Sequence, residues 1–278
     1  MKRALILLFS VLASLNLSAQ KSTVVIGQVD VTSGVKSQWA EVLRSNIVSG
    51  LASSPRLIVI DGKTMNDLPS NTADAISKLR ETGADCLLTA QITSFIGKTE
   101  SSSDGKTTWY TATLEYSVTV TNVSDGSTRG NQKETHRGIS KSGYDEAYSS
   151  AFNSISSDMK KVVSTMFRVS GEIKALAETH PKKGAKTLYV SIGSDAGISA
   201  GDILEVFKEV EIAGETISEK IGELKAKEIK SGTLTLCNVS KGGSEIMKAF
   251  DDGLKLTVVS RPLKDILGGI NNVLDSVL

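Results

Sequence analysis

The sequence predicts an α+β protein: a two-layer α/β sandwich in the order β-α-β-α-β-β-β-α, followed by a small, mostly β barrel. In the first part of the chain, segments with apolar residues at the helical period lie between segments that alternate apolar and polar residues. From residue 187 onward, short strand-like segments separated by glycine turns replace that pattern. With 278 residues, the chain is long enough for two domains that each bury a core.

Residues 1–19 have the charge and hydropathy order of a secretory signal peptide. Lys2 and Arg3 precede an apolar run at 4–17, and Ser18-Ala19-Gln20 places a small residue at the expected cleavage site. The apolar run is shorter than the roughly 20 residues that a membrane-spanning helix needs. No cysteine lies near this site to carry a lipid. We therefore expect a soluble exported protein, periplasmic in a Gram-negative bacterium, and not a lipoprotein.

Residues 20–169 are predicted to form the sandwich, and its first half alternates strands with helices. The predicted strands are residues 23–31 and 56–61, and the predicted helices are residues 33–54 and 72–83. The strand segments are rich in β-branched residues, whereas the first helical segment has apolar residues at near-helical spacing until Pro55 ends it. Gly83 is expected to cap the second helix.

The second half of the sandwich is predicted to contain three strands and a helix. The predicted elements are a long strand at 83–97, a polar loop at 98–107, strands at 108–123 and 127–140, and a helix at 143–169. One face of strand 108–123 is apolar and the other polar; the apolar residues are Ala112, Leu114, Tyr116, Val118 and Val120. Asp125-Gly126 is a hairpin turn signal. The return strand is polar, which is typical of a sheet edge.

The remaining chain is predicted to be a linker, a small barrel and a helical tail. Residues 170–186 contain Pro181 and a cluster of lysines and indicate a linker. Residues 187–261 contain five strand segments and one short helix. Residues 262–278 place apolar residues at helical spacing after Pro262 and predict an amphipathic helix. Whether this helix packs on its own chain or on a partner stays open.

Residues 197–201 (GISAG) match the G-x-S-x-G pattern that can mark a serine nucleophile. A serine-hydrolase elbow needs a strand, a turn and then a helix, with the catalytic histidine later in the chain. Here the segment after Gly201 alternates as a strand does, and no histidine follows His180. We therefore interpret the segment as a tight glycine turn and Ser199 as noncatalytic.

The histidines and cysteines do not form a recognisable site in the sequence. His136 lies in a polar strand, His180 precedes a proline, and neither has the neighbours of a typical metal motif. Cys86 and Cys237 are predicted to be buried strand thiols in different domains. An oxidising compartment permits a disulfide between them, so this pairing stays open.

The charge distribution adds no further site. The acidic pairs Asp145-Glu146 and Asp251-Asp252 consist of adjacent residues, whose side chains diverge, and no P-loop motif occurs. The 32 basic and 31 acidic residues give a net charge of +1, which does not indicate a nucleic-acid partner. The sequence therefore predicts no catalytic, cofactor-binding or metal-ligating residues and no cofactor.

The run TGADCLLTAQITSFIG, together with the element order of residues 22–169, resembles bacterial envelope proteins related to the curli-secretion protein CsgG and to LpoB, an activator of a penicillin-binding protein. That resemblance implies an anticodon-binding-like domain. The stretch LYVSIGSDAGISAGDILEVFK is similar to the C-terminal barrel of the flagellar assembly protein FlgT, and this likeness covers residues 187–261.

The resemblance implies a noncatalytic accessory or scaffold protein of the cell envelope that acts through protein–protein contacts. The partner is an unidentified envelope protein, or a second copy of the chain. The alternative is a ring-forming subunit of an outer-membrane secretion channel. Strand 127–140 carries Arg129, Lys133 and Arg137, which would be costly against lipid, so no integral membrane insertion is expected.

Overall fold

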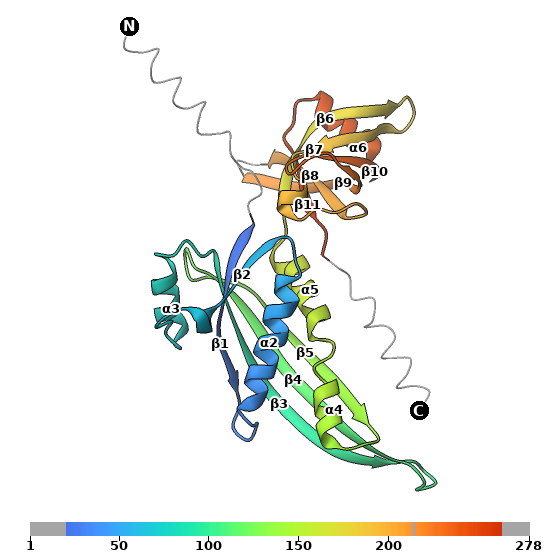
Figure 1. Ribbon diagram of the computed structural model, residues 1–278. Helices are drawn as coiled ribbons and strands as arrows, with labels where there is room; N and C mark the ends of the chain where they lie inside the picture. The colour runs from blue at the N-terminus through green and yellow to red at the C-terminus, as the bar shows by residue number, and fades with distance from the viewer. Residues whose placement is uncertain (1–20, 213–214, 263–278) are drawn as a thin grey trace.

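The computed structural model describes residues 21–212 and 215–262, and it contains a five-stranded sheet with helices and a closed six-stranded barrel (Figure 1). This confirms the mixed α+β class and the presence of a barrel. The predicted signal peptide at 1–19, and the predicted tail beyond Pro262, lie outside the described residues. No helix in the described ranges is long and apolar enough to cross a membrane.

The sheet has the strand order β2-β1-β3-β4-β5. Its strands are β1 (Ser22–Val31), β2 (Leu57–Asp61), β3 (Cys86–Ser101), β4 (Thr108–Asn122) and β5 (Thr128–Ser140). The helices of this domain are α2 (Gln38–Ala52), the short η1 (Gly62–Thr64), α3 (Thr72–Leu79), α4 (Tyr144–Ser150) and α5 (Ile155–Met166). Strand β1 runs parallel to β2 and β3, while β3, β4 and β5 form an antiparallel meander.

Two apolar clusters cover the two faces of this sheet unequally. The larger cluster joins α2 and α5 to the strands through side chains such as Leu43, Ile47 and Met159. The smaller cluster packs α3 against the opposite face through Ile76 and Leu79. The apolar face predicted for β4 is buried, from Ala112 to Val120, because its alternate residues point into the larger cluster.

The helix predicted at 143–169 is two helices. The chain turns between α4 and α5, where Phe152 and Asn153 donate backbone hydrogen bonds to the carbonyls of Ser149 and Ser150. These bonds span three residues instead of four, which tightens and ends a helix. The Ser150 hydroxyl also donates to the Ala147 carbonyl and competes with the helical pattern. The apolar spacing does not report these local bonds, so the sequence analysis missed the break.

The prediction of a linker at 170–186 is wrong, because these residues form strands of the barrel. The barrel consists of β6 (Ser170–His180), β7 (Gly184–Val190), β8 (Ile203–Ile212), β9 (Glu215–Ile229), β10 (Thr235–Lys241) and β11 (Leu256–Ser260), with η2 (Ser194–Ala196) and helix α6 (Gly243–Asp251). Its closed order is β10-β7-β6-β11-β8-β9. Strand β6 is mostly exposed and buries only Ile173 fully, so its charged outward face resembles a linker in the sequence.

Candidate functional site

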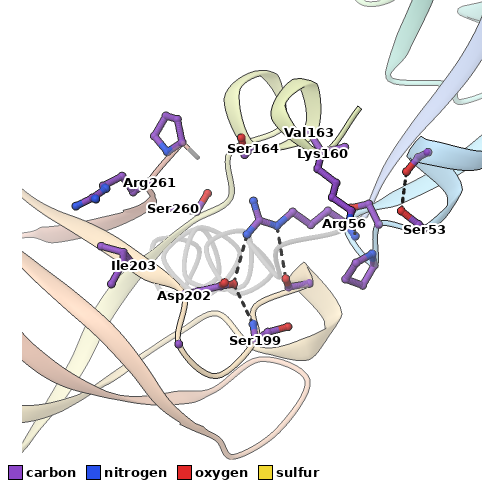
Figure 2. Close-up of a pocket in the computed structure, with 16 residues that line it drawn as sticks. Ser53, Arg56, Lys160, Val163, Ser164, Ser199, Asp202, Ile203, Ser260 and Arg261 are labelled. Carbon is purple, nitrogen blue, oxygen red and sulfur yellow. Dashed lines mark hydrogen bonds and ion pairs between the residues drawn. The ribbon is translucent and has the colours of Figure 1, made fainter. Parts of the chain in front are cut away.

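A cleft of about 590 Å³ lies where the sheet domain meets the barrel (Figure 2). The sheet domain contributes the end of α2, the loop at 53–56 and one face of α5. The barrel contributes the turn at 197–203 and the residues that end β11. The cleft is therefore built from segments far apart in the sequence, and only the folded two-domain chain brings them together.

The G-x-S-x-G turn forms one wall of this cleft. Gly197 has a φ of +69°, a backbone conformation that favours glycine, and a Cβ there would lie 2.5 Å from Cγ of Arg56. The turn is closed by Asp202, whose carboxylate accepts a hydrogen bond from the Ser199 backbone N–H at 3.0 Å. Glycine is thus needed at position 197 for close contact between the domains.

Ser199 does not sit in a serine-hydrolase elbow. The turn leads into strand β8, as the sequence predicts, and not into a helix. No hydrogen bond within residues 21–212 and 215–262 joins Ser199 to a histidine. Ser199 is instead one of five serines along the cleft; the others are Ser53, Ser54, Ser164 and Ser260.

Arg56 reaches across the cleft and is its most buried cation. Its side chain is 14% exposed, and its guanidinium lies 3.5 Å from the Asp202 carboxylate. Its Nε donates to the Gly197 carbonyl, also at 3.5 Å. Burial lowers the pKa of Arg56 by desolvating the charge, and the carboxylate of Asp202 partly offsets this. An arginine remains protonated in such a setting, so the cleft holds a fixed positive charge.

The rest of the lining is apolar or cationic. Pro55, Val163 and Ile203 supply apolar surface. Lys160 and Arg261 add two more cationic side chains, and Arg261 lies 3.6 Å from Glu223 of strand β9. Groups of this kind can hold an anion or an apolar body. They do not include a nucleophile with a base to activate it.

A second cluster surrounds His136 and was missed by the sequence analysis. Glu134 and His136 on β5 and Asp158 on α5 offer ligand atoms that lie within 4.8 Å of one another. The expectation that His136 lacks the neighbours of a metal site is therefore wrong, because two carboxylates lie at ligand distance from it. Glu134 and His136 share one face of a strand, which the sequence does show. Asp158 is 22 residues further along and meets them only after α5 packs on the sheet.

Asp158 is the centre of this cluster. Its side chain is 3% exposed, and its Oδ2 accepts a hydrogen bond from the Tyr116 hydroxyl at 2.5 Å. His136 Nε2 lies 2.5 Å from the same oxygen. Burial, followed by the negative charge of Asp158, raises the pKa of Tyr116 above its ordinary value. The Tyr116 hydroxyl is thus held in its protonated form as a donor.

A lysine already lies beside the two carboxylates that could hold a metal. Lys161 Nζ lies 3.6 Å from a Glu134 oxygen and 3.8 Å from an Asp158 oxygen. A divalent ion bound by Glu134, His136 and Asp158 would have to overcome repulsion from this ammonium. We therefore interpret the cluster as a network of hydrogen bonds and ion pairs that stabilises the packing of α5 on β4 and β5. That the chain binds no metal stays a prediction.

The other candidate residues lie apart from both sites. His180 is at the β6–β7 turn, where its Nδ1 accepts from the Lys182 backbone N–H. Cys86 and Cys237 are free and buried in separate cores, and burial raises the pKa of each thiol, to about 11 and about 12 respectively. The acidic pairs lie on helices: Asp145-Glu146 in the first turn of α4, and Asp251-Asp252 at the end of α6.

Strand β5 forms one edge of the sheet, as its polar sequence predicts. It is 13 residues long and pairs with β4 on one side. No strand pairs with its other side in the parts of the chain that the structure describes. The face of β5 away from the helices carries exposed Lys133, Thr135 and Arg137. A long, accessible strand edge is a template for pairing with another chain.

No family model and no curated protein matches this chain. Several solved structures resemble part of it, and three of them illustrate the likeness. A PelC dodecamer from Paraburkholderia phytofirmans is 15% identical over 50% of this chain and 87% of that chain, with a TM-score of 0.32. Lipoprotein GNA1162 from Neisseria meningitidis is 12% identical over 43% and 84%, with a TM-score of 0.32. The LpoB C-terminal domain from Salmonella enterica is 13% identical over 47% and 92%, with a TM-score of 0.28.

These likenesses are weak, since each TM-score lies below 0.5. The finer resemblance to CsgG, and that of the barrel to FlgT, stays a prediction.

Proposed function

We propose that this chain is a noncatalytic accessory protein of the bacterial cell envelope that acts by contact with a protein partner. The observation that carries the proposal is the edge strand β5, with 13 residues and one side open to pairing in the described structure. An added strand gains main-chain hydrogen bonds along such an edge, while alternate side chains select the partner. The signal peptide predicted at 1–19 from the sequence is consistent with this exported location.

The polar character of the neighbouring surface suits edge pairing better than apolar docking. The uncovered face of β3, β4 and β5 carries many threonines and charged residues. Its large exposed apolar side chains are Ile96, 54% exposed, and Ile139, 52% exposed. They lie on different strands with β4 between them, so they do not form a broad apolar patch.

The chemistry of the titratable groups supports a noncatalytic role. The groups around His136 contact one another in a network of hydrogen bonds and ion pairs, and Ser199 lies in a turn whose carboxylate partner binds a backbone N–H. A general acid or base needs an accessible substrate position within hydrogen-bond reach. Asp158, at the centre of the network, is too buried to offer one.

Site-specific photo-crosslinking tests the proposal. A photoreactive phenylalanine analogue replaces Thr135, which is exposed on β5, and in a matched control it replaces Lys227, which is exposed on barrel strand β9. The proposal predicts a discrete adduct with another protein at position 135 and none at 227. An adduct of twice the chain mass would instead favour the ring-forming subunit. No adduct at 135 in intact cells would contradict the proposal.

A further inference from the structure

The guanidinium of Arg56 is largely shielded from water, yet its contacts in the described structure are long. A guanidinium has five N–H donors in a planar fork, and bidentate carboxylate pairs have N–O distances of about 2.7–2.9 Å. In the described part of the chain, Arg56 meets Asp202 and the Gly197 carbonyl, each at 3.5 Å. Such long contacts recover little of the free energy lost when a side chain that is 14% exposed leaves water.

The charge of the surrounding cleft is also unbalanced. Its lining includes three cationic side chains, Arg56, Lys160 and Arg261, and one acidic side chain, Asp202. Lys160 comes from α5, on the same domain as Arg56, whereas Arg261 points away from Arg56 (Figure 2) and lies 3.6 Å from Glu223. Arg56 and Lys160 therefore supply the excess positive charge over Asp202. A concave surface with excess positive charge attracts anions and strengthens their binding by excluding water.

The size and lining of the cleft restrict the kind of anion. Its volume of about 590 Å³ is in the range of small-molecule sites. The walls are largely apolar and include Pro55, Val163 and Ile203, with serine hydroxyls between them. A fully hydrated inorganic ion would leave this apolar surface unused. An apolar body that carries one anionic group would use both features.

We propose that the cleft between the sheet domain and the barrel binds an amphipathic small molecule through its carboxylate or phosphate group. The anionic group pairs with Arg56, and the apolar body lies against Pro55, Val163 and Ile203. Binding replaces the long Arg56–Asp202 contact by a closer charge-assisted one. This inference is independent of the partner contact proposed for β5, because none of its residues lies on that strand.

Three eight-carbon probes separate the contributions of charge and of apolar surface. Octanoate, octyl phosphate and octanol are titrated into the full mature chain below their aggregation concentrations, and heat is recorded by calorimetry. Octanoate or octyl phosphate is expected to bind with one-to-one stoichiometry and at least about tenfold more tightly than octanol, consistent with a charge-assisted contact. The two anions distinguish a carboxylate site from a phosphate site. Equal affinity for octanol, or no binding of either anion, would overturn the proposal.

Variants of Arg56 and Asp202 distinguish a ligand-binding site from an ion pair that only stabilises the fold. Arg56→Gln should weaken anion binding about tenfold or more and leave octanol unchanged. Asp202→Asn should strengthen anion binding several-fold, because it removes a competing carboxylate while its amide oxygen still accepts from Ser199. A purely structural ion pair predicts that neither variant changes anion affinity, and that result would refute the proposal.

Three further variants locate the binding site and control for misfolding. Ser199→Phe fills part of the cleft from its exposed turn and should weaken all three probes. Arg137→Gln removes an exposed arginine on β5 and should change none of the affinities. Arg56→Lys keeps the charge and should retain part of the anion binding if Arg56→Gln fails to fold. Unchanged binding in Ser199→Phe would place the ligand elsewhere and contradict the proposal.

Discussion

At the scale of single residues, Asp158 shows how groups that look catalytic can serve stability. A buried carboxylate is costly unless each oxygen finds donors or opposite charge. Tyr116, His136 and Lys161 supply these contacts from two strands and from the helix itself. The same side chains would suggest a metal or acid–base site if their geometry were ignored.

Asp158→Ala is expected to lower the free energy of unfolding by about 3 kcal/mol, because it leaves the buried Tyr116 hydroxyl and His136 without their acceptor. Tyr116→Phe removes one donor and should cost about 1 kcal/mol. Glu115→Ala, on the exposed face of β4, is the control and should change stability by less than about 0.5 kcal/mol. Urea unfolding measures all three, and a change in Asp158→Ala no larger than the control would refute the network.

The two thiols are expected to be unreactive in the folded chain. Burial raises the pKa of Cys86 to about 11 and that of Cys237 to about 12, so little thiolate exists at pH 8. A colourimetric disulfide reagent at pH 8 should titrate neither thiol in the native protein and both in denaturant. Rapid reaction of one native thiol, or fewer than two thiols in denaturant, would show that a cysteine is exposed or oxidised.

At the scale of residues, sequence reasoning predicted local structure but not the contacts that depend on tertiary packing. It identified the strand character after Gly201 and hence the failure of the serine-hydrolase pattern. It could not place Asp158 beside His136, because that contact depends on the angle at which α5 crosses the sheet. It also gave no reason to single out Arg56, since the turn at Gly197 reaches it only when the domains meet.

At the scale of elements, the alternation of apolar and polar residues predicted the buried face of a strand where the opposite face is exposed. Strand β4 satisfies this condition, and its apolar face was predicted residue by residue. Strand β6 does not, because most of its residues are exposed in the barrel wall and the sequence pattern is obscured. The break between α4 and α5 was missed for another reason: it is marked by backbone bonds that span three residues, and apolar spacing does not report these.

Helix α4 lies very close to the sheet edge, and Gly138 permits this approach. A Cβ at this position would lie within 2.6 Å of three atoms of α4 and its end: the Ala147 carbonyl oxygen, the Ser150 hydroxyl and the Ala151 nitrogen. Gly138→Ala should therefore displace α4 and cost about 2 kcal/mol or more, as overpacking does.

The control for this change is Gly126→Ala in the β4–β5 turn. No atom lies within 4 Å of a Cβ there, but φ is +75°, so the cost should be about 1 kcal/mol from backbone strain alone. Thermal unfolding compares the two variants. If Gly138→Ala lowers the melting temperature no more than Gly126→Ala does, α4 does not pack closely on β5 at Gly138.

The barrel should lose stability in acid through Glu223. Hydrogen bonds from Lys220 and Lys241 lower its pKa from 4.5 to about 2. Since the folded pKa is below the unfolded one, this contribution is fully present above about pH 4.5 and is lost as pH falls toward 2. The melting temperature of wild type should therefore fall over this window more steeply than that of Glu223→Gln. If the melting temperatures of wild type and Glu223→Gln fall in parallel as the pH is lowered, Glu223 does not contribute to stability in this way.

At the scale of the whole molecule, the two domains are joined by more than a covalent connection. Arg168, between α5 and β6, donates to the Ser260 carbonyl and pairs with Glu205, each at 2.7 Å. The turn at Gly197 packs on Arg56 from the other side. The cleft lies at this junction. In the described residues, strand β5 forms an edge of the sheet and has no strand paired to its outer side (Figure 1). These are the two different surfaces that we propose for binding.

The central claim is that the chain works by presenting surfaces to a partner and not by catalysis. Crosslinking from position 135 in living cells measures this most directly, because it records what lies against the free side of β5 under native conditions. The account predicts one dominant adduct with an envelope protein, absent from position 227. Uniform, weak labelling at both positions would mean that this edge has no specific partner, and the claim would fail.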